Sequence, residues 1–165
     1  MHLLALLILA LTPIGPQTES LNMPSVWISQ DTKWVRAPKD YNPNLSSGRA
    51  TILYFRSDGK FGLLHCVLNR TDKYLVISAG DGYVVEDGTW IANGANLTIR
   101  KRLVYETGPK VGATYPGPQT LASARVSGKG AKAAIELDRR RFSPASDPME
   151  FSPENLERWF FKSFN

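Results

Sequence analysis

Cysteine and long apolar runs are what this sequence has least of. Cys66 is the only cysteine among 165 residues, which excludes an internal disulfide framework and any metal site built from several cysteines. The longest apolar run, residues 3–11, has 9 residues, whereas a membrane-spanning helix needs about 20. Neither a G-x-S-x-G motif nor the spacing of a Walker phosphate loop is present. The sequence therefore carries no sign of a nucleophile elbow, a nucleotide-binding loop or a membrane-spanning helix.

The composition is that of an ordinary globular protein of one domain. Hydrophobic residues make up 42% and charged residues 21% of the 165-residue chain, which argues against disorder. Lys and Arg exceed Asp and Glu by 20 to 15, so the net charge is +5. A charge of this size permits contact with anionic surfaces but does not require it.

The amino terminus has the features of a secretory signal peptide. Residues 3–11 (LLALLILAL) have the length of its apolar core, and a helix-breaking stretch with Pro13 and Pro16 follows. We predict a signal peptide over residues 1–20, cleavage after Ser20, and export to a periplasm or to the outside. No transmembrane segment would remain in the mature chain. The alternative is a buried N-terminal strand or helix.

Export also bears on partners and on modification. It makes nucleic acid the weaker partner for a chain with a modest positive charge. Three Asn-x-Ser/Thr sequons begin at Asn44, Asn69 and Asn96. In a eukaryotic secretory protein they would be glycosylation acceptors, whereas in most bacteria they would carry no meaning.

Residues 50–106 alternate short apolar segments with turn residues, the pattern of an antiparallel meander. Asp58-Gly59 and Asn93-Gly94 each lie between two apolar segments, which predicts hairpins. No helical pattern separates the segments, which argues against βαβ units. A loop rich in Pro and Gly follows over residues 107–119. The predicted strands are residues 50–56, 61–69, 74–78, 83–85, 89–91, 97–106, 121–127 and 132–142.

The last residues change to a helical period. Ser152-Pro153 is a typical helix start, with a capping serine and a proline at the first helical position. Leu156, Trp159 and Phe160 fall on one face of such a helix. We therefore predict an α-helix over residues 152–164 that packs across the sheet.

Together these elements predict an all-β fold, mainly an antiparallel meander, with one C-terminal α-helix. About seven or eight antiparallel strands suit a lipocalin-like barrel wide enough for one small ligand. A two-sheet β-sandwich uses a similar number of strands and is the alternative. In domain terms we expect the signal peptide at 1–20, an extended segment over 21–49, and a barrel-like domain with its helix over 50–165.

One stretch of the chain is similar to a known family. The turn Asp58-Gly59-Lys60-Phe61 follows an apolar strand, and Gly88-Thr89-Trp90 precedes a short Asn-Gly turn and the strand Leu97-Thr98-Ile99. Over residues 50–106 this resembles small exported bacterial lipocalin-like proteins of uncharacterised function. The resemblance implies a calyx-like β-barrel that binds a small ligand. It departs from the lipocalins proper, whose G-x-W lies on the first barrel strand and not in mid-chain.

Two cations share a strand face with apolar residues and are candidates for a ligand site. By alternation, Lys101 lies on the face of Ile99 and Tyr105, and Arg139 on the face of Leu137. If these faces point inward, each cation needs a counter-charge, which a carboxylate ligand such as a fatty acid would supply. Alternatively, Lys101 lies at a bulge or reaches the barrel rim, and Arg139 lies beyond the barrel end. The candidate ligand-binding residues are Lys101, Arg139, Tyr105 and Trp90.

His65 and Cys66 are neighbours on a predicted strand and so point to opposite faces, which excludes a catalytic pair. We expect His65 to be structural or at the surface, and Cys66 to be a buried small hydrophobe or, alternatively, to form an intermolecular disulfide. The chain shows no catalytic, metal or cofactor set, so its status as an enzyme is uncertain and a non-catalytic role is favoured.

The leading hypothesis is an exported barrel that binds a small apolar or amphipathic ligand. The alternative is a cell-envelope module that binds an anionic surface or a protein partner through its terminal helix or its basic face, with Arg100, Arg102, Arg140 and Arg141.

Overall fold

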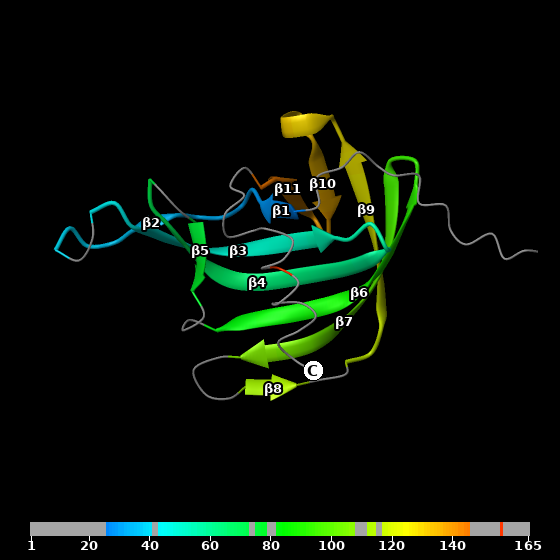
Figure 1. The fold of residues 1–165 in the computed structure, drawn as a ribbon, viewed down its shortest axis with the longest axis horizontal. Helices are drawn as coiled ribbons and strands as arrows, with labels where there is room; N and C mark the ends of the chain where they lie inside the picture. The colour runs from blue at the N-terminus through cyan, green and yellow to red at the C-terminus, as the bar shows by residue number, and fades with distance from the viewer. Residues whose placement is uncertain are drawn as a thin grey trace, which may run out of the picture.

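The structure is a computed structural model, and it describes residues 26–40, 43–72, 75–78, 82–107, 112–114, 117–145 and 156. These residues form an 11-stranded antiparallel sheet and one short 3-10 turn (Figure 1). The strands are β1 (Val26–Ser29), β2 (Val35–Arg36), β3 (Ser46–Phe55), β4 (Lys60–Arg70), β5 (Leu75–Ser78), β6 (Tyr83–Asn93), β7 (Asn96–Thr107), β8 (Gly112–Thr114), β9 (Thr120–Ser127), β10 (Ala134–Leu137) and β11 (Arg140–Pro144).

Eight of the strands close into a barrel. β3, β1, β11, β10, β9, β7, β6 and β4 pair in this order, and β4 pairs with β3 to complete the ring. β2, β5 and β8 lie outside the ring, paired with β3, β4 and β7 respectively. In Figure 1 the long strands β3, β4, β6 and β7 lie side by side as one curved wall. Because the sheet closes on itself, the fold is one barrel and not the two stacked sheets of a sandwich.

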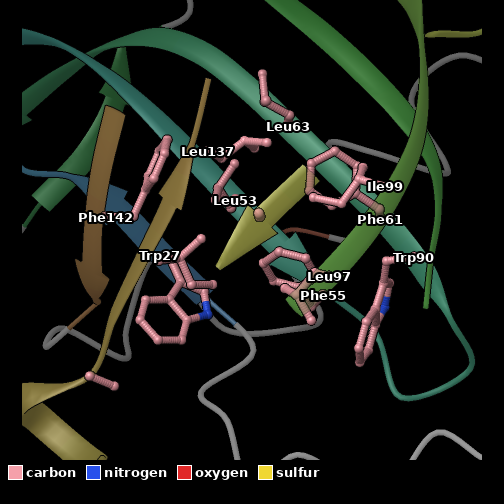
Figure 2. Close-up of a cluster of buried hydrophobic side chains, with 13 residues drawn as sticks. Trp27, Leu53, Phe55, Phe61, Leu63, Trp90, Leu97, Ile99, Leu137 and Phe142 are labelled. Atoms are coloured by element: carbon pink, nitrogen blue, oxygen red, sulfur yellow. The ribbon is translucent and has the colours of Figure 1, made fainter. Parts of the chain in front are cut away.

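The barrel interior is packed with apolar side chains at the end near the turn between β3 and β4. Gly59 has a φ of 82°, and this turn sets Leu53 opposite Leu63 and Phe55 opposite Phe61. Because side chains alternate across a strand, these four share the inner face. They belong to a buried cluster, the apolar core, to which β1, β6, β7, β9, β10 and β11 also contribute. Figure 2 shows its rings and aliphatic chains gathered between the strands, so the protein's own side chains fill this end.

A second buried cluster lies on the outer face of the same wall. Ile52, Leu64 and Cys66 point away from the apolar core and pack with Leu156, which is 0% exposed. Burial on both faces explains why β3 and β4 read as almost continuous apolar runs in the sequence.

The fold class therefore needs a correction at the C-terminus. The helical element found among the described residues is the 3-10 turn at Gly130–Lys132, and the predicted α-helix over 152–164 is not part of the described fold. Of that range only Leu156 is described; its backbone is helical and its side chain is buried in the outer cluster, so the described structure contains a single residue of the predicted helix and no helical element there. No helix in the described part of the chain is long and apolar enough to cross a membrane. The predicted signal peptide, residues 1–20, lies outside the described residues.

Several strands differ from the expected organisation. β6 joins the two strands expected over 83–85 and 89–91, and β8 lies within 107–119, where we expected a loop. β1 lies within the segment 21–49 that we expected to precede the barrel, yet it pairs with both β3 and β11 in the barrel wall. The single strand expected over 132–142 is instead the hairpin β10–β11, because Asp138 and Arg139 have φ values of 50° and 64°. A two-residue turn with both φ values positive matches the twist of a hairpin, so the chain reverses there.

Candidate functional site: the mouth of the barrel

The inner face of the barrel changes from apolar to polar at one level. Leu53 and Thr51 are consecutive inward-facing residues of β3, and Thr51 is the one farther from the β3–β4 turn. Thr51 lies opposite His65 on β4. The same change occurs on three further strands. On each of these five strands, one inward residue is apolar and the next inward residue is polar: Leu53 then Thr51 on β3, Leu63 then His65 on β4, Trp27 then Ser29 on β1, Ile99 then Lys101 on β7, and Phe142 then Arg140 on β11. We call the polar end, with Ser29, Thr51, His65, Lys101 and Arg140, the mouth.

A cavity of about 870 Å³ opens at the mouth. This volume lies within the range of about 300–1,000 Å³ that small-molecule sites occupy. A second cavity of about 240 Å³ lies below that range and borders Leu63, Leu137 and Phe142 of the apolar core. Thr51, His65 and Arg140 line both cavities and so separate them. The lining of the larger one includes Ser29, Asp31, Lys33, Val35, Arg49, Thr51, His65, Val67, Val84 and Arg140.

A chain of hydrogen bonds crosses the mouth from β11 to β4. Arg140 Nη1 donates to Thr51 Oγ1, and Thr51 Oγ1 lies 2.8 Å from His65 Nδ1. Because a guanidinium only donates, the threonine hydroxyl accepts from Arg140 and is free to donate to the imidazole. His65 Nδ1 then accepts, which is the arrangement of a neutral imidazole with its proton on Nε2. The Thr51 backbone N–H is held in turn by Ser29 Oγ at 2.9 Å.

The surroundings of His65 favour its neutral form. Burial lowers the pKa of His65 below 6.5, the charge of Glu86 opposes this, and the charges of Arg140 and Lys101 add to it. The described residues hold no group of three side chains suited to a metal ion. The imidazole therefore sits in the mouth as a neutral acceptor that a change in local charge can protonate.

Lys101 points into the barrel, as alternation along β7 predicted, but it already has counter-charges. Its Nζ lies 2.9 Å from Glu86 Oε2 and 3.1 Å from Asp138 Oδ2, and its side chain is 14% exposed. Burial works against its charge, but the hydrogen bonds and charges of Glu86 and Asp138 prevail and raise the pKa of Lys101. From the sequence we expected a ligand carboxylate to balance the charge of Lys101. The protein itself supplies two such carboxylates, Glu86 on β6 and Asp138 in the β10–β11 turn.

The other three candidate residues do not gather around Lys101. Arg139 is exposed, because it is the second residue of the β10–β11 turn. A bulge where β6 and β7 pair sets the backbone of Tyr105 opposite Val85, and the side chain of Tyr105 lies outside the described part of the structure. Trp90 is buried in the apolar core, where its indole N–H donates to the Arg56 carbonyl at 2.9 Å. It packs edge-on against a ring of that core.

The sequence argument missed Thr51, assigned Arg140 to the basic outer face and undervalued His65. One signal could have found two of them. The predicted hairpin at Asp58-Gly59 pairs Phe55 with Phe61, and counting outward along the same face brings Thr51 opposite His65. Two polar residues opposite each other on an otherwise apolar inner face are a marker of a site.

Arg102 and Arg141, two of the four basic residues expected on the outer face, have acidic partners. Arg102 Nε lies 2.9 Å from Asp87 Oδ1, and Arg141 Nη1 lies 3.4 Å from Glu136 Oε1. Arg140 belongs to the mouth. Exposed pairs of this kind contribute little to stability, but they do reduce the net charge that the face presents.

Comparison with models of protein families, with curated proteins and with solved structures gives no match to this chain. The closed antiparallel barrel of eight strands is consistent with the lipocalin-like architecture that residues 50–106 resemble.

Proposed function

We propose that this protein binds a small amphipathic ligand in the mouth of its barrel and carries out no catalysis. The observation that supports this most directly is the cavity of about 870 Å³ beneath which the inner face changes from polar to apolar. The second cavity, which borders the apolar core deeper in the barrel, has a volume of about 240 Å³. The ligand is therefore expected at the mouth and not in a deep calyx.

The lining of the mouth suits a ligand with both apolar and polar parts. Val35, Val67 and Val84 offer apolar surface, and Arg140, which also lines the cavity, offers hydrogen-bond donors. Small-molecule sites commonly combine apolar walls with a few convergent polar groups that orient the ligand.

A fluorescent fatty acid, dansyl-labelled undecanoic acid, tests the proposal with two matched tryptophan variants. Val67→Trp adds bulk to the cavity, whereas Ile91→Trp adds the same bulk on the outer face, where Ile91 is 51% exposed. We expect the wild type and Ile91→Trp to increase and blue-shift the dansyl emission, and Val67→Trp to lose most of this binding. Circular dichroism would verify that both variants fold. Equal binding by all three proteins, or by none of them, would refute the proposal.

We also propose that the protein is exported. The apolar run over residues 3–11 and the helix-breaking stretch after it support this. Sequencing the amino terminus of the protein recovered from its own host would test it: a mature chain that starts at Leu21 is expected, and a chain that retains residues 1–20 would contradict it.

A further inference from the structure

We propose that the ligand of the mouth is a carboxylate, that Arg140 and Thr51 hold its oxygens, and that His65 takes up a proton when it binds. This inference rests on the proposed function, because it assigns a chemical class to the ligand of the same cavity.

The charges around the cavity favour an anion. Among the residues that the structure describes, Lys33, Arg49 and Arg140 line it against one acidic residue, Asp31. The carboxylate of Asp31 lies 3.8 Å from Arg140 Nε, and both side chains are about half exposed, at 45% and 59%. That separation exceeds a hydrogen bond, so the guanidinium keeps donors for an incoming carboxylate, which arginine binds with two parallel bonds.

Lys101 is a poorer receptor than Arg140, although it lies deeper. Two carboxylates lie within 2.9 and 3.1 Å of its Nζ, and an incoming carboxylate would have to displace one of them. Arg140 is instead held in place by Thr51 Oγ1 from one side and has the cavity on the other. Arg140 is therefore the residue that we expect to select for a carboxylate.

Thr51 connects the receptor to the imidazole. While His65 is neutral, the Thr51 hydroxyl donates its proton to His65 Nδ1. Once Nδ1 carries a proton, it becomes a donor, and Thr51 Oγ1 can accept from both His65 and Arg140 with its two lone pairs. The hydroxyl proton is then free to turn to the carboxylate. Protonation of His65 thus adds a hydrogen-bond donor to the site, and the proton comes from solvent.

Five groups face His65 and set its protonation. They are Thr51 from β3, Glu86 from β6, Lys101 from β7, Asp138 from the β10–β11 turn and Arg140 from β11. In the empty mouth, burial and the two cations keep the imidazole neutral. A carboxylate beside Arg140 adds a negative charge and favours the imidazolium. Linkage then requires the carboxylate to bind more tightly as the pH falls through the titration of His65.

Octanoate, with 1-octanol as its uncharged match, tests this inference. The pKa of His65 would be measured by NMR of its ring protons, assigned by their loss in His65→Gln, with the protein empty and with each probe. We expect octanoate to raise the pKa of His65 by about one unit, which corresponds to about tenfold tighter binding at low pH than at high pH. Octanol is expected to bind with no change in the pKa of His65 and no dependence on pH.

Three variants locate the effect. Arg140→Gln should weaken octanoate about tenfold and leave octanol unchanged, since one charge-assisted pair is lost. His65→Gln keeps an acceptor for Thr51 but cannot titrate, so octanoate should bind without the increase at low pH. Arg100→Gln, on the exposed face of β7, is the control and should behave as the wild type.

The outcomes separate this inference from the proposed function. Binding of both probes with equal affinity, unaffected by Arg140→Gln or by pH, would overturn the inference and leave a binding mouth intact. Binding of neither probe would overturn both. Octanoate binding that responds to Arg140→Gln but leaves the pKa of His65 unchanged would overturn the proton uptake.

Discussion

Replacing Gly88 by alanine should destabilise the barrel through one close approach between β6 and β7. A Cβ at Gly88 would lie 1.8 Å from the carbonyl oxygen of Arg100, and within 3.0 Å of two more backbone atoms of β7, a separation that real Cβ atoms essentially never show. These neighbours are main-chain atoms of a paired strand, so no side chain can move aside. The two strands would have to separate by more than 1 Å at this point.

The magnitude follows from that separation. Hydrogen bonds of the ladder, ordinarily about 2.9 Å from N to O, would be stretched beyond bonding distance, at about 1 kcal/mol each. The neighbouring pair of Trp90 and Ile99, both buried in the apolar core, would shift with them. We expect a loss of about 3 kcal/mol, in the upper range for overpacking. For a chain of this size that corresponds to a fall of about 10 °C in Tm.

Thermal unfolding followed by circular dichroism measures the effect, and Gly94→Ala provides the comparison. Gly94 has open space around it but a φ of 60°, so its replacement meets only the penalty of about 1–2 kcal/mol for a left-handed residue. Gly88→Ala should therefore melt below Gly94→Ala. If the strands did not approach so closely, alanine within a strand would stabilise the protein by about 0.5–1 kcal/mol. A Tm for Gly88→Ala at or above that of the wild type would refute the reasoning.

Two further predictions concern buried titratable groups. Lys101→Met should lower the free energy of unfolding in urea by about 1–2 kcal/mol near pH 7, because Glu86 and Asp138 lose their shared cation. Burial opposes the charge of Lys101, but its two carboxylate partners raise its pKa above 10.5. The wild type should therefore keep its full advantage in free energy of unfolding below pH 10.5 and lose it as the pH rises through the raised pKa. A difference in free energy of unfolding that does not depend on pH would contradict this. Burial raises the pKa of the Cys66 thiol to about 12. A thiol-disulfide reagent near about pH 8 should therefore react with Cys66 only after urea has unfolded the protein. Immediate reaction of the folded protein would contradict this, because it would show that the thiol is accessible.

The turns of the meander could be predicted from the sequence because they use glycine where a positive φ is needed. Asp58-Gly59 and Asn93-Gly94 are both hairpin turns, with φ values of 82° and 60° at the glycines. The turn at Asp138-Arg139 was missed because it contains no glycine, and arginine rarely adopts a positive φ. Without that turn, alternation assigned Arg139 to the inner face, whereas the reversal of the chain places Arg140 there.

The closure of the barrel and the content of its mouth depend on pairings that no local pattern encodes. β1 has four residues and no adjacent hairpin partner, so nothing nearby in the sequence marks it as a barrel strand. Lys101 was correctly placed on the face of Ile99, but its partners Glu86 and Asp138 come from other strands and turns. Only the three-dimensional pairing shows that the charge of Lys101 is already balanced by two carboxylates, whereas Arg140 lines the larger cavity with one described carboxylate, Asp31, at 3.8 Å.

The pairing of β1 with β11 also has a consequence for the order in which the chain can fold. Trp27 pairs with Pro144, so the ring cannot close until residue 144 has left the ribosome. Until then, the growing meander has unpaired strands at both of its sides, and such edges readily pair with other chains. Contacts this distant in sequence also slow folding. The time that β1 takes to pair with β3 and β11 therefore sets how long the nascent protein is prone to aggregation. Once β1 has paired with both strands, the ring of eight strands has no unpaired edge.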